Sequence, residues 1–113
     1  MRLTSQIWVS ALLRRVHGQG DYAVIGRKGA AEAGAVFVRN LHRDGTYSLF
    51  GPAPQSFFDT EKPEDRTFEL RLDRGSEQDT VRILDREIDF DRDLWVVELE
   101  TDTPEAYVPV TPA

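Results

Sequence analysis

The side chains with the widest chemical repertoire in this 113-residue chain are two histidines, His17 and His42. A histidine activates a serine or cysteine that lies within hydrogen-bond reach. The chain has no cysteine and no Gly-x-Ser-x-Gly turn. Ser10 precedes His17 by seven residues, which is about 10 Å along a helix. The sequence therefore favours structural roles for both histidines and indicates no catalytic residue.

A second candidate for chemistry is the alternating acidic run Asp89, Asp91 and Asp93, with a glutamate twelfth counted from the first of them. This spacing is typical of the carboxylates of a calcium-binding loop. Such a loop needs glycine at its sixth position, where this chain has Leu94, and residues 95–99 are too apolar to coordinate a cation. We interpret the run as a solvated acidic turn and predict neither a metal nor a cofactor.

Cationic side chains offer a third chemistry, the binding of phosphate groups. The net charge is −6, but residues 1–54 hold seven Lys or Arg against three Asp or Glu, and residues 55–113 hold seven against seventeen. The acidic total argues against broad nucleic-acid affinity, whereas the split leaves room for a local basic face unless the halves interleave in space. Nucleic-acid or phosphometabolite binding stays as an alternative function, carried by Arg14, His17, Arg27, Lys28, Arg39 and Arg43.

Arg15 stands out because it lies in the same column of the expected first helix as Trp8, inside the apolar face. A cation there must stack on Trp8, extend past the edge of the core or pair with a carboxylate. We favour a structural role, such as an ion pair. The functional alternative places Arg15 at a pocket with Arg14 beside it.

The strongest functional candidate is the segment Phe50–Phe58, Phe-Gly-Pro-Ala-Pro-Gln-Ser-Phe-Phe, which we expect to be a stiff irregular loop. Proline lowers the ordering cost of binding, and an exposed aromatic pair is typical of interface hot spots. The alternative is that one ring fills the open end of the sheet. The binding candidates in it are Phe50, Pro52, Pro54, Gln55, Phe57 and Phe58.

Hydrophobic periodicity and capping signals indicate the helices and strands that position these candidate residues. Thr4 or Ser5 caps a first helix that ends at His17, with Gly18 after it and an apolar face formed by Ile7, Trp8, Ala11, Leu12 and Val16. Ser76 caps a second helix. Strands are expected over 22–27, 34–42, 46–50, 67–73 and 94–100.

Asp44-Gly45 predicts a two-residue hairpin turn between the second and third strands, since both positions tolerate positive φ. In that register His42 faces Tyr47, Asn40 faces Leu49 and Arg39 faces Phe50.

The order helix, four strands, helix, strand predicts a single α+β domain over 1–103. We expect a mainly antiparallel sheet of four to five strands, with both helices on one face. Residues 104–113, rich in proline, are expected to form a poorly ordered C-terminal tail.

Several stretches also resemble a known family. They are Arg2-Leu3 with Ile7-Trp8-Val9 and Leu13-Arg14-Arg15, the strand Gly34–Val38, Tyr47 with Phe50–Gln55, and Phe90-Asp91 with Trp95–Glu98. Together they are similar to the small uncharacterised bacterial proteins catalogued as domain of unknown function fourteen ninety-one. The resemblance extends to about Glu100 and implies a bacterial protein, with no activity, ligand or catalytic residue to carry over.

No stretch approaches the roughly 20 apolar residues of a membrane span, and Arg14 and Arg15 interrupt the apolar run near the N-terminus. We therefore expect a cytoplasmic, acidic protein with no membrane partner. The leading hypothesis is a small non-catalytic protein-interaction module that uses residues 50–58 and a sheet edge to bind an unidentified protein or a second copy. Nucleic-acid or phosphometabolite binding ranks second. An enzyme with acidic and histidine side chains in a cleft ranks third.

Overall fold

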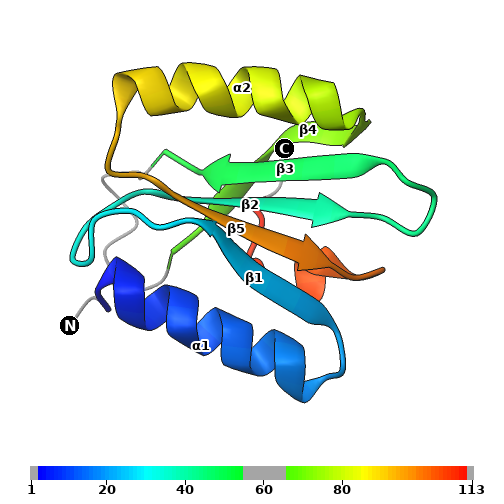
Figure 1. Ribbon diagram of the computed structural model, residues 1–113. Helices are drawn as coiled ribbons and strands as arrows, with labels where there is room; N and C mark the ends of the chain where they lie inside the picture. The colour runs from blue at the N-terminus through cyan, green and yellow to red at the C-terminus, as the bar shows by residue number, and fades with distance from the viewer. Residues whose placement is uncertain (1–2, 55–65, 112–113) are drawn as a thin grey trace.

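The structure, a computed structural model, describes residues 3–54 and 66–111. The predicted α+β order is confirmed, and all seven expected elements are present (Figure 1). In chain order the elements are α1 (Ser5–Gly18), β1 (Tyr22–Arg27), β2 (Val36–Leu41), β3 (Tyr47–Pro52), β4 (Phe68–Gly75), α2 (Glu77–Phe90), β5 (Trp95–Glu100) and a single 3-10 turn, η1 (Pro104–Ala106).

The five strands form one mixed sheet in the order β1-β5-β2-β3-β4. The last strand in sequence, β5, lies between β1 and β2 and runs parallel to β2, while the other three pairings are antiparallel. The parallel pair arises because the chain leaves β4, at one border of the sheet, and returns through α2 to the interior. A sequence of hairpins alone would have given the fully antiparallel meander.

The helices lie on opposite faces of the sheet, which corrects the expectation that both share one face (Figure 1). The α1 face holds Trp8, Leu12 and Val16 of α1, while the α2 face holds Leu84 of α2. The physical reason is visible in β2 and β5, where the runs 36–38 and 95–97 are buried at every position. Strands that are apolar on both faces need a cover on each.

The first helix begins where it was predicted, with the Thr4 side chain accepting a hydrogen bond from the Ile7 N–H at 3.3 Å. Its buried stripe is rotated from the expected one: Val9 is fully buried, and Ile7 is exposed. The helix also continues through Gly18, and the positive φ of its exit belongs to Gly20, at 82°. Trp8, Leu12 and Val16 of the predicted apolar face are buried, and the correction is that Val9 belongs to that face and Ile7 does not.

The hairpin between β2 and β3 has a different register from the predicted one. Arg39 pairs with Leu49 and Asn40 pairs with Ser48. The His42 N–H donates to the Thr46 carbonyl at 2.8 Å, and the Gly45 N–H donates to the His42 carbonyl at 3.0 Å. The turn thus contains three residues, with Gly45 at φ 89°, which is the common three-residue loop with a left-handed last position.

The C-terminal segment packs on the α1 face as far as residue 111, which corrects the expectation of a poorly ordered tail from 104. Pro104, Tyr107 and Val108 are buried. The Phe68 N–H donates to the Pro109 carbonyl at 2.8 Å, and the Thr111 N–H donates to the Phe68 carbonyl at 2.8 Å. The segment is ordered because it supplies apolar cover that α1 alone does not provide.

Candidate functional site

In the proline and aromatic segment, residues 50–52 belong to strand β3, and residues 53 and 54 follow the end of that strand. Strand β3 extends through Pro52, so Phe50, with an exposed fraction of 2%, belongs to the core rather than to a loop. Pro54 is exposed. Gln55, Phe57 and Phe58 lie outside the described residues, so their use in binding stays a prediction.

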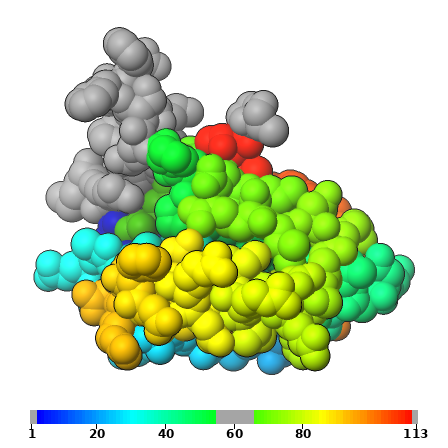
Figure 2. All heavy atoms as spheres, turned by 90° about the horizontal axis from the view of Figure 1, so that it is seen from above, coloured from blue at the N-terminus to red at the C-terminus, as the bar shows by residue number. Residues whose placement is uncertain are grey.

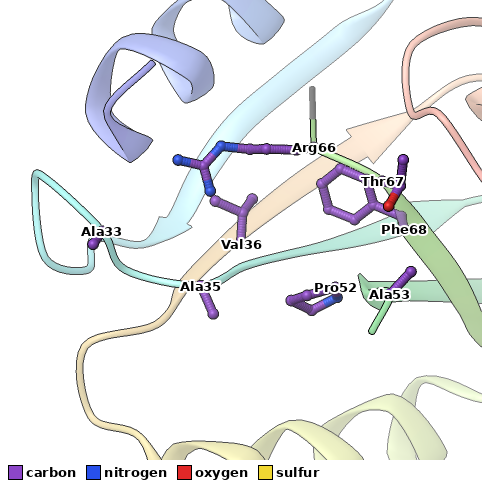
Figure 3. Close-up of a pocket in the computed structure, with 8 residues that line it drawn as sticks. All are labelled: Ala33, Ala35, Val36, Pro52, Ala53, Arg66, Thr67 and Phe68. Atoms are coloured by element: carbon purple, nitrogen blue, oxygen red, sulfur yellow. The ribbon is translucent and has the colours of Figure 1, made fainter. Parts of the chain in front are cut away.

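A small pocket of about 190 Å³ opens where β3 ends and β4 begins (Figure 3). Such a volume is close to that of an engineered apolar cavity of about 150 Å³ that holds benzene, and below the roughly 300 Å³ at which ligand sites start. The pocket is therefore small for a ligand site. Its lining residues are Ala33, Ala35, Val36, Pro52, Ala53, Arg66, Thr67 and Phe68.

Arg66 is the charged residue of this pocket, and its guanidinium is engaged in holding the N-terminal segment. It donates to the Leu3 carbonyl and to Ser5 Oγ, each at 3.1 Å, while Ser5 Oγ donates to the Gly34 carbonyl. The guanidinium therefore ties the start of α1 to the residues that precede β4.

The cations proposed for phosphate binding are not brought together. Arg14 and His17 lie on α1, whereas Arg39 lies on the opposite face of the sheet and binds Glu98 through two bonds of 2.9 and 3.0 Å. Arg43 forms an ion pair with Asp102 at 2.7 Å. The exposed Lys28 follows the end of β1, and Arg27 donates to the Arg92 carbonyl at 2.9 Å.

Arg15 contacts the C-terminal segment, donating from its guanidinium to the Tyr107 carbonyl at 3.2 Å. The Tyr107 hydroxyl in turn donates to Asp21 Oδ2 at 2.6 Å, and the Thr101 hydroxyl donates to the same oxygen at 3.0 Å. The hydrogen bond to Asp21, with burial second, raises the pKa of Tyr107. This cluster fastens the C-terminal segment to the start of β1.

A serine and a histidine that the sequence analysis did not pair lie together at one end of the sheet. His42 Nε2 is 2.7 Å from Ser48 Oγ, and both residues are buried. Asn40 Oδ1 accepts from the Thr101 N–H, which turns its amide nitrogen toward His42 Nδ1 at 3.4 Å. His42 and Ser48 are therefore hydrogen-bonded to each other, and Asn40, which also donates to the Thr101 carbonyl at 3.1 Å, connects this pair to the end of β5.

Strand β1 forms one border of the sheet, and four of its six residues are exposed. Tyr22, Val24 and Ile25 have exposed fractions of 56, 40 and 38%. On the face that Tyr22 and Val24 share, α2 packs over β3 and β4. Seen from that side, α2 covers the centre, and blue N-terminal atoms emerge along the lower border (Figure 2).

The backbone of β1 also has outward hydrogen-bonding groups. His17 Nε2 donates to the Ala23 carbonyl at 2.9 Å from outside the sheet. The Asp21 N–H donates to the Val16 carbonyl at 3.1 Å and not to β5, and with the His17 bond this indicates that Ala23, two residues later, directs its amide groups away from β5. Because this direction alternates along an antiparallel strand, Ile25 does the same.

Within residues 3–54 and 66–111, no three acidic or histidine side chains converge as a metal site would require. Asp91 instead accepts a hydrogen bond from the Asp93 N–H at 2.9 Å, which is an ordinary acidic turn. The same part of the chain contains no helix long and apolar enough to cross a bilayer.

The fold and its surface define a small α+β domain with a mixed five-stranded sheet, one border of which is left open. The model of the family described as "Protein of unknown function (DUF1491)" matches residues 3–108, and the chain belongs to that family. The predicted resemblance is therefore confirmed. No curated protein matches the chain.

Solved structures similar to the chain come from two bacteria. The solution structure of a protein from A. tumefaciens has 47% identity and a TM-score of 0.88, over 100% of this chain and 98% of that one. A DUF1491 family protein from Caulobacter crescentus CB15 was solved by crystallography, with 36% identity, a TM-score of 0.78 and coverage of 99% of this chain and 100% of that chain. An NMR structure of a DUF1491 family protein from the same organism has 34% identity, a TM-score of 0.79 and coverage of 99% of both chains.

Proposed function

We propose that the protein is a non-catalytic protein-interaction module that accepts an extended strand along the open border of β1. One observation carries this proposal: outward amide groups and a row of exposed apolar side chains occur on the same strand. Addition of a strand to a sheet edge takes its affinity from backbone hydrogen bonds and its specificity from alternating side chains.

The sequence of β1 supports this use because it lacks the usual protection of an edge. Natural edges are blunted by charged side chains, proline or a covering segment. Between Tyr22 and Gly26 this strand has neither a charged residue nor a proline. Its pairing with β5 is regular as far as Ile25, and the bulge that disturbs it follows at Gly26. The regular part can therefore template another strand.

A synthetic strand peptide tests the proposal directly. The probe is an acetylated alternating peptide of Thr and Val with a lysine at each end, titrated into ¹⁵N-labelled protein. We expect shifts of the Ala23 and Ile25 amide resonances, because their outward N–H groups gain acceptors. A peptide with proline in place of each valine is the control, and it should cause no shift.

Two results would contradict edge docking. One is an unchanged spectrum of β1 at millimolar peptide. The other is an equal response along β4, which would indicate non-specific adsorption. Ile25→Pro, which removes an outward N–H, should abolish the response while the remaining dispersed resonances report a folded domain.

A further inference from the structure

We infer that the strand accepted by β1 is β1 of a second copy of this chain, running antiparallel to it across a two-fold axis. This inference rests on the proposed function and names its partner. A two-fold interface uses the same surface on both subunits, so the surface must be complementary to itself. The hydrogen bonds, side chains and charges of β1 meet that requirement in one register.

The hydrogen bonds select a register centred on Val24. In it, Ala23 of one copy pairs with Ile25 of the other, and both residues direct their amide groups outward. The register centred on Ala23 would instead need the N–H of Asp21, which already donates to the Val16 carbonyl at 3.1 Å. A register centred on Ile25 would run into the bulge at Gly26. The register centred on Val24 takes its hydrogen bonds from Ala23 and Ile25, which both lie in the regular part of the strand.

The side chains fit the same register. Val24 lies opposite Val24 of the second copy, which joins two exposed β-branched side chains. Tyr22 lies opposite Gly26 of the second copy. A Cβ added at Gly26 would come within 2.8 Å of Glu98 Oε2, so a larger residue would require the Glu98 side chain, which Arg39 binds, to move. An aromatic ring across from an edge glycine covers the backbone that the glycine exposes.

Charge sets the strength of this association. No charged side chains oppose each other between Tyr22 and Gly26, but each whole chain carries a net charge of −6, so two copies repel at long range. Because salt screens that repulsion, we expect tighter association at higher salt. A paired strand this short gives an interface at the small end of the range, and we expect a dissociation constant on the order of 100 µM.

The sharpest test introduces charges of the same sign, and then of opposite sign, at the two-fold axis. Val24→Lys places two lysines opposite each other, and Val24→Glu places two glutamates there. Each variant alone should dimerise at least about tenfold more weakly than the natural chain. An equimolar mixture should recover the association, because lysine then faces glutamate. Sedimentation velocity between about 10 µM and 1 mM, at two salt concentrations, measures all three.

Leu70→Lys is the matched control, because Leu70 is 45% exposed on the opposite border strand and Val24 is 40% exposed on β1. It should leave the dissociation constant unchanged. Equal weakening by Leu70→Lys would overturn the assignment to β1, and a mixture that fails to recover association would overturn the register.

The outcome for the partner is separable from the outcome for the proposed function. A natural chain that stays monomeric at 1 mM, yet binds the alternating peptide at Ala23 and Ile25, would refute the second copy and keep edge docking. A monomer that also ignores the peptide would refute both.

Discussion

The two border strands of the sheet, β1 and β4, both have an edge that could pair with another chain, and they differ in how well that edge is protected. Four of the eight residues of β4 are charged, and its pairing with β3 shifts register in two places. The start of β4 is also paired with the C-terminal segment through Phe68. Strand β1 has one charged residue, Arg27 at its end. Charge, irregularity and cover are the devices that keep edges from pairing, and they are concentrated on one border.

The side chains of the two border strands also differ in their contacts with the rest of the domain. Arg71 on β4 contacts Glu69 at 2.9 Å, Glu87 at 3.2 Å and the Pro52 carbonyl at 2.9 Å. These contacts attach the border strand to α2. On β1, Ala23 is buried in the cluster that contains α1, and its carbonyl accepts a hydrogen bond from His17 of that helix. The β4 border is thus tied to α2 through a charged side chain, whereas β1 has no charged residue before Arg27.

The largest effect expected from this difference is on stability. Phe68→Ala should lower the free energy of unfolding by about 3–5 kcal/mol, because the ring is 1% exposed and packs 5.3 Å from the Trp8 ring. Val24→Ala should lower it by less than about 1 kcal/mol, since Val24 is already partly in water. Urea unfolding of both variants measures the contrast. Similar losses would mean that β1 is as buried as β4.

A smaller effect is expected from the charges of the β4 border. Arg71→Ala removes two ion pairs, a hydrogen bond and a stacking contact with Phe37, whose ring centroid lies 5.4 Å from the guanidinium. We expect a loss of about 1–2 kcal/mol. Arg82→Ala, which breaks an exposed pair with Asp79, is the control and should change stability by less than about 0.5 kcal/mol. The same urea titration compares them, and equal losses would contradict a structural β4 border.

Much of the fold could be predicted because its local signals agree. Thr4 and Ser76 do cap the two helices, and both start where these residues predicted. The predictions that failed concern contacts between residues far apart in the sequence. The insertion of β5 beside β2 depends on a crossover that no local pattern records. The fully buried triplet 36–38 did carry a signal, since apolar runs without alternation indicate a strand covered on both faces.

The candidate site was harder to predict, for a related reason. Phe50 was predicted to be an aromatic for binding, yet β3 extends past it and buries it. The exposure of Tyr22 and Val24 depends on which strand ends up at the border, and border position is a property of the whole sheet. The sequence of residues 22–27 alone does not show whether another strand will cover it, because that strand would come from a distant part of the chain.

The smallest expected effect concerns the C-terminal segment, which connects the two borders beneath the sheet. It contacts the start of β1 through the Tyr107 hydroxyl and contacts β4 through Pro109 and Thr111. The hydrogen bond to Asp21, with burial second, raises the pKa of Tyr107 above its ordinary value of 10.0. A group whose pKa is higher in the folded state stabilises the fold below its unfolded pKa and loses that contribution as pH rises through the folded value.

The Tyr107 contribution should therefore be complete below pH 10 and decline above it, because a phenolate would then face the Asp21 carboxylate. Tyr107→Phe should be less stable at neutral pH but show a flatter decline of unfolding free energy from about pH 10 upward. Urea titrations at several pH values measure the slope, with Tyr22→Phe as a control at an exposed ring. Hydrogen exchange then locates the change: at high pH we expect faster exchange near the start of β1, with Phe68 still protected by Pro109. Loss of protection at both borders together would show that the C-terminal segment releases as one unit.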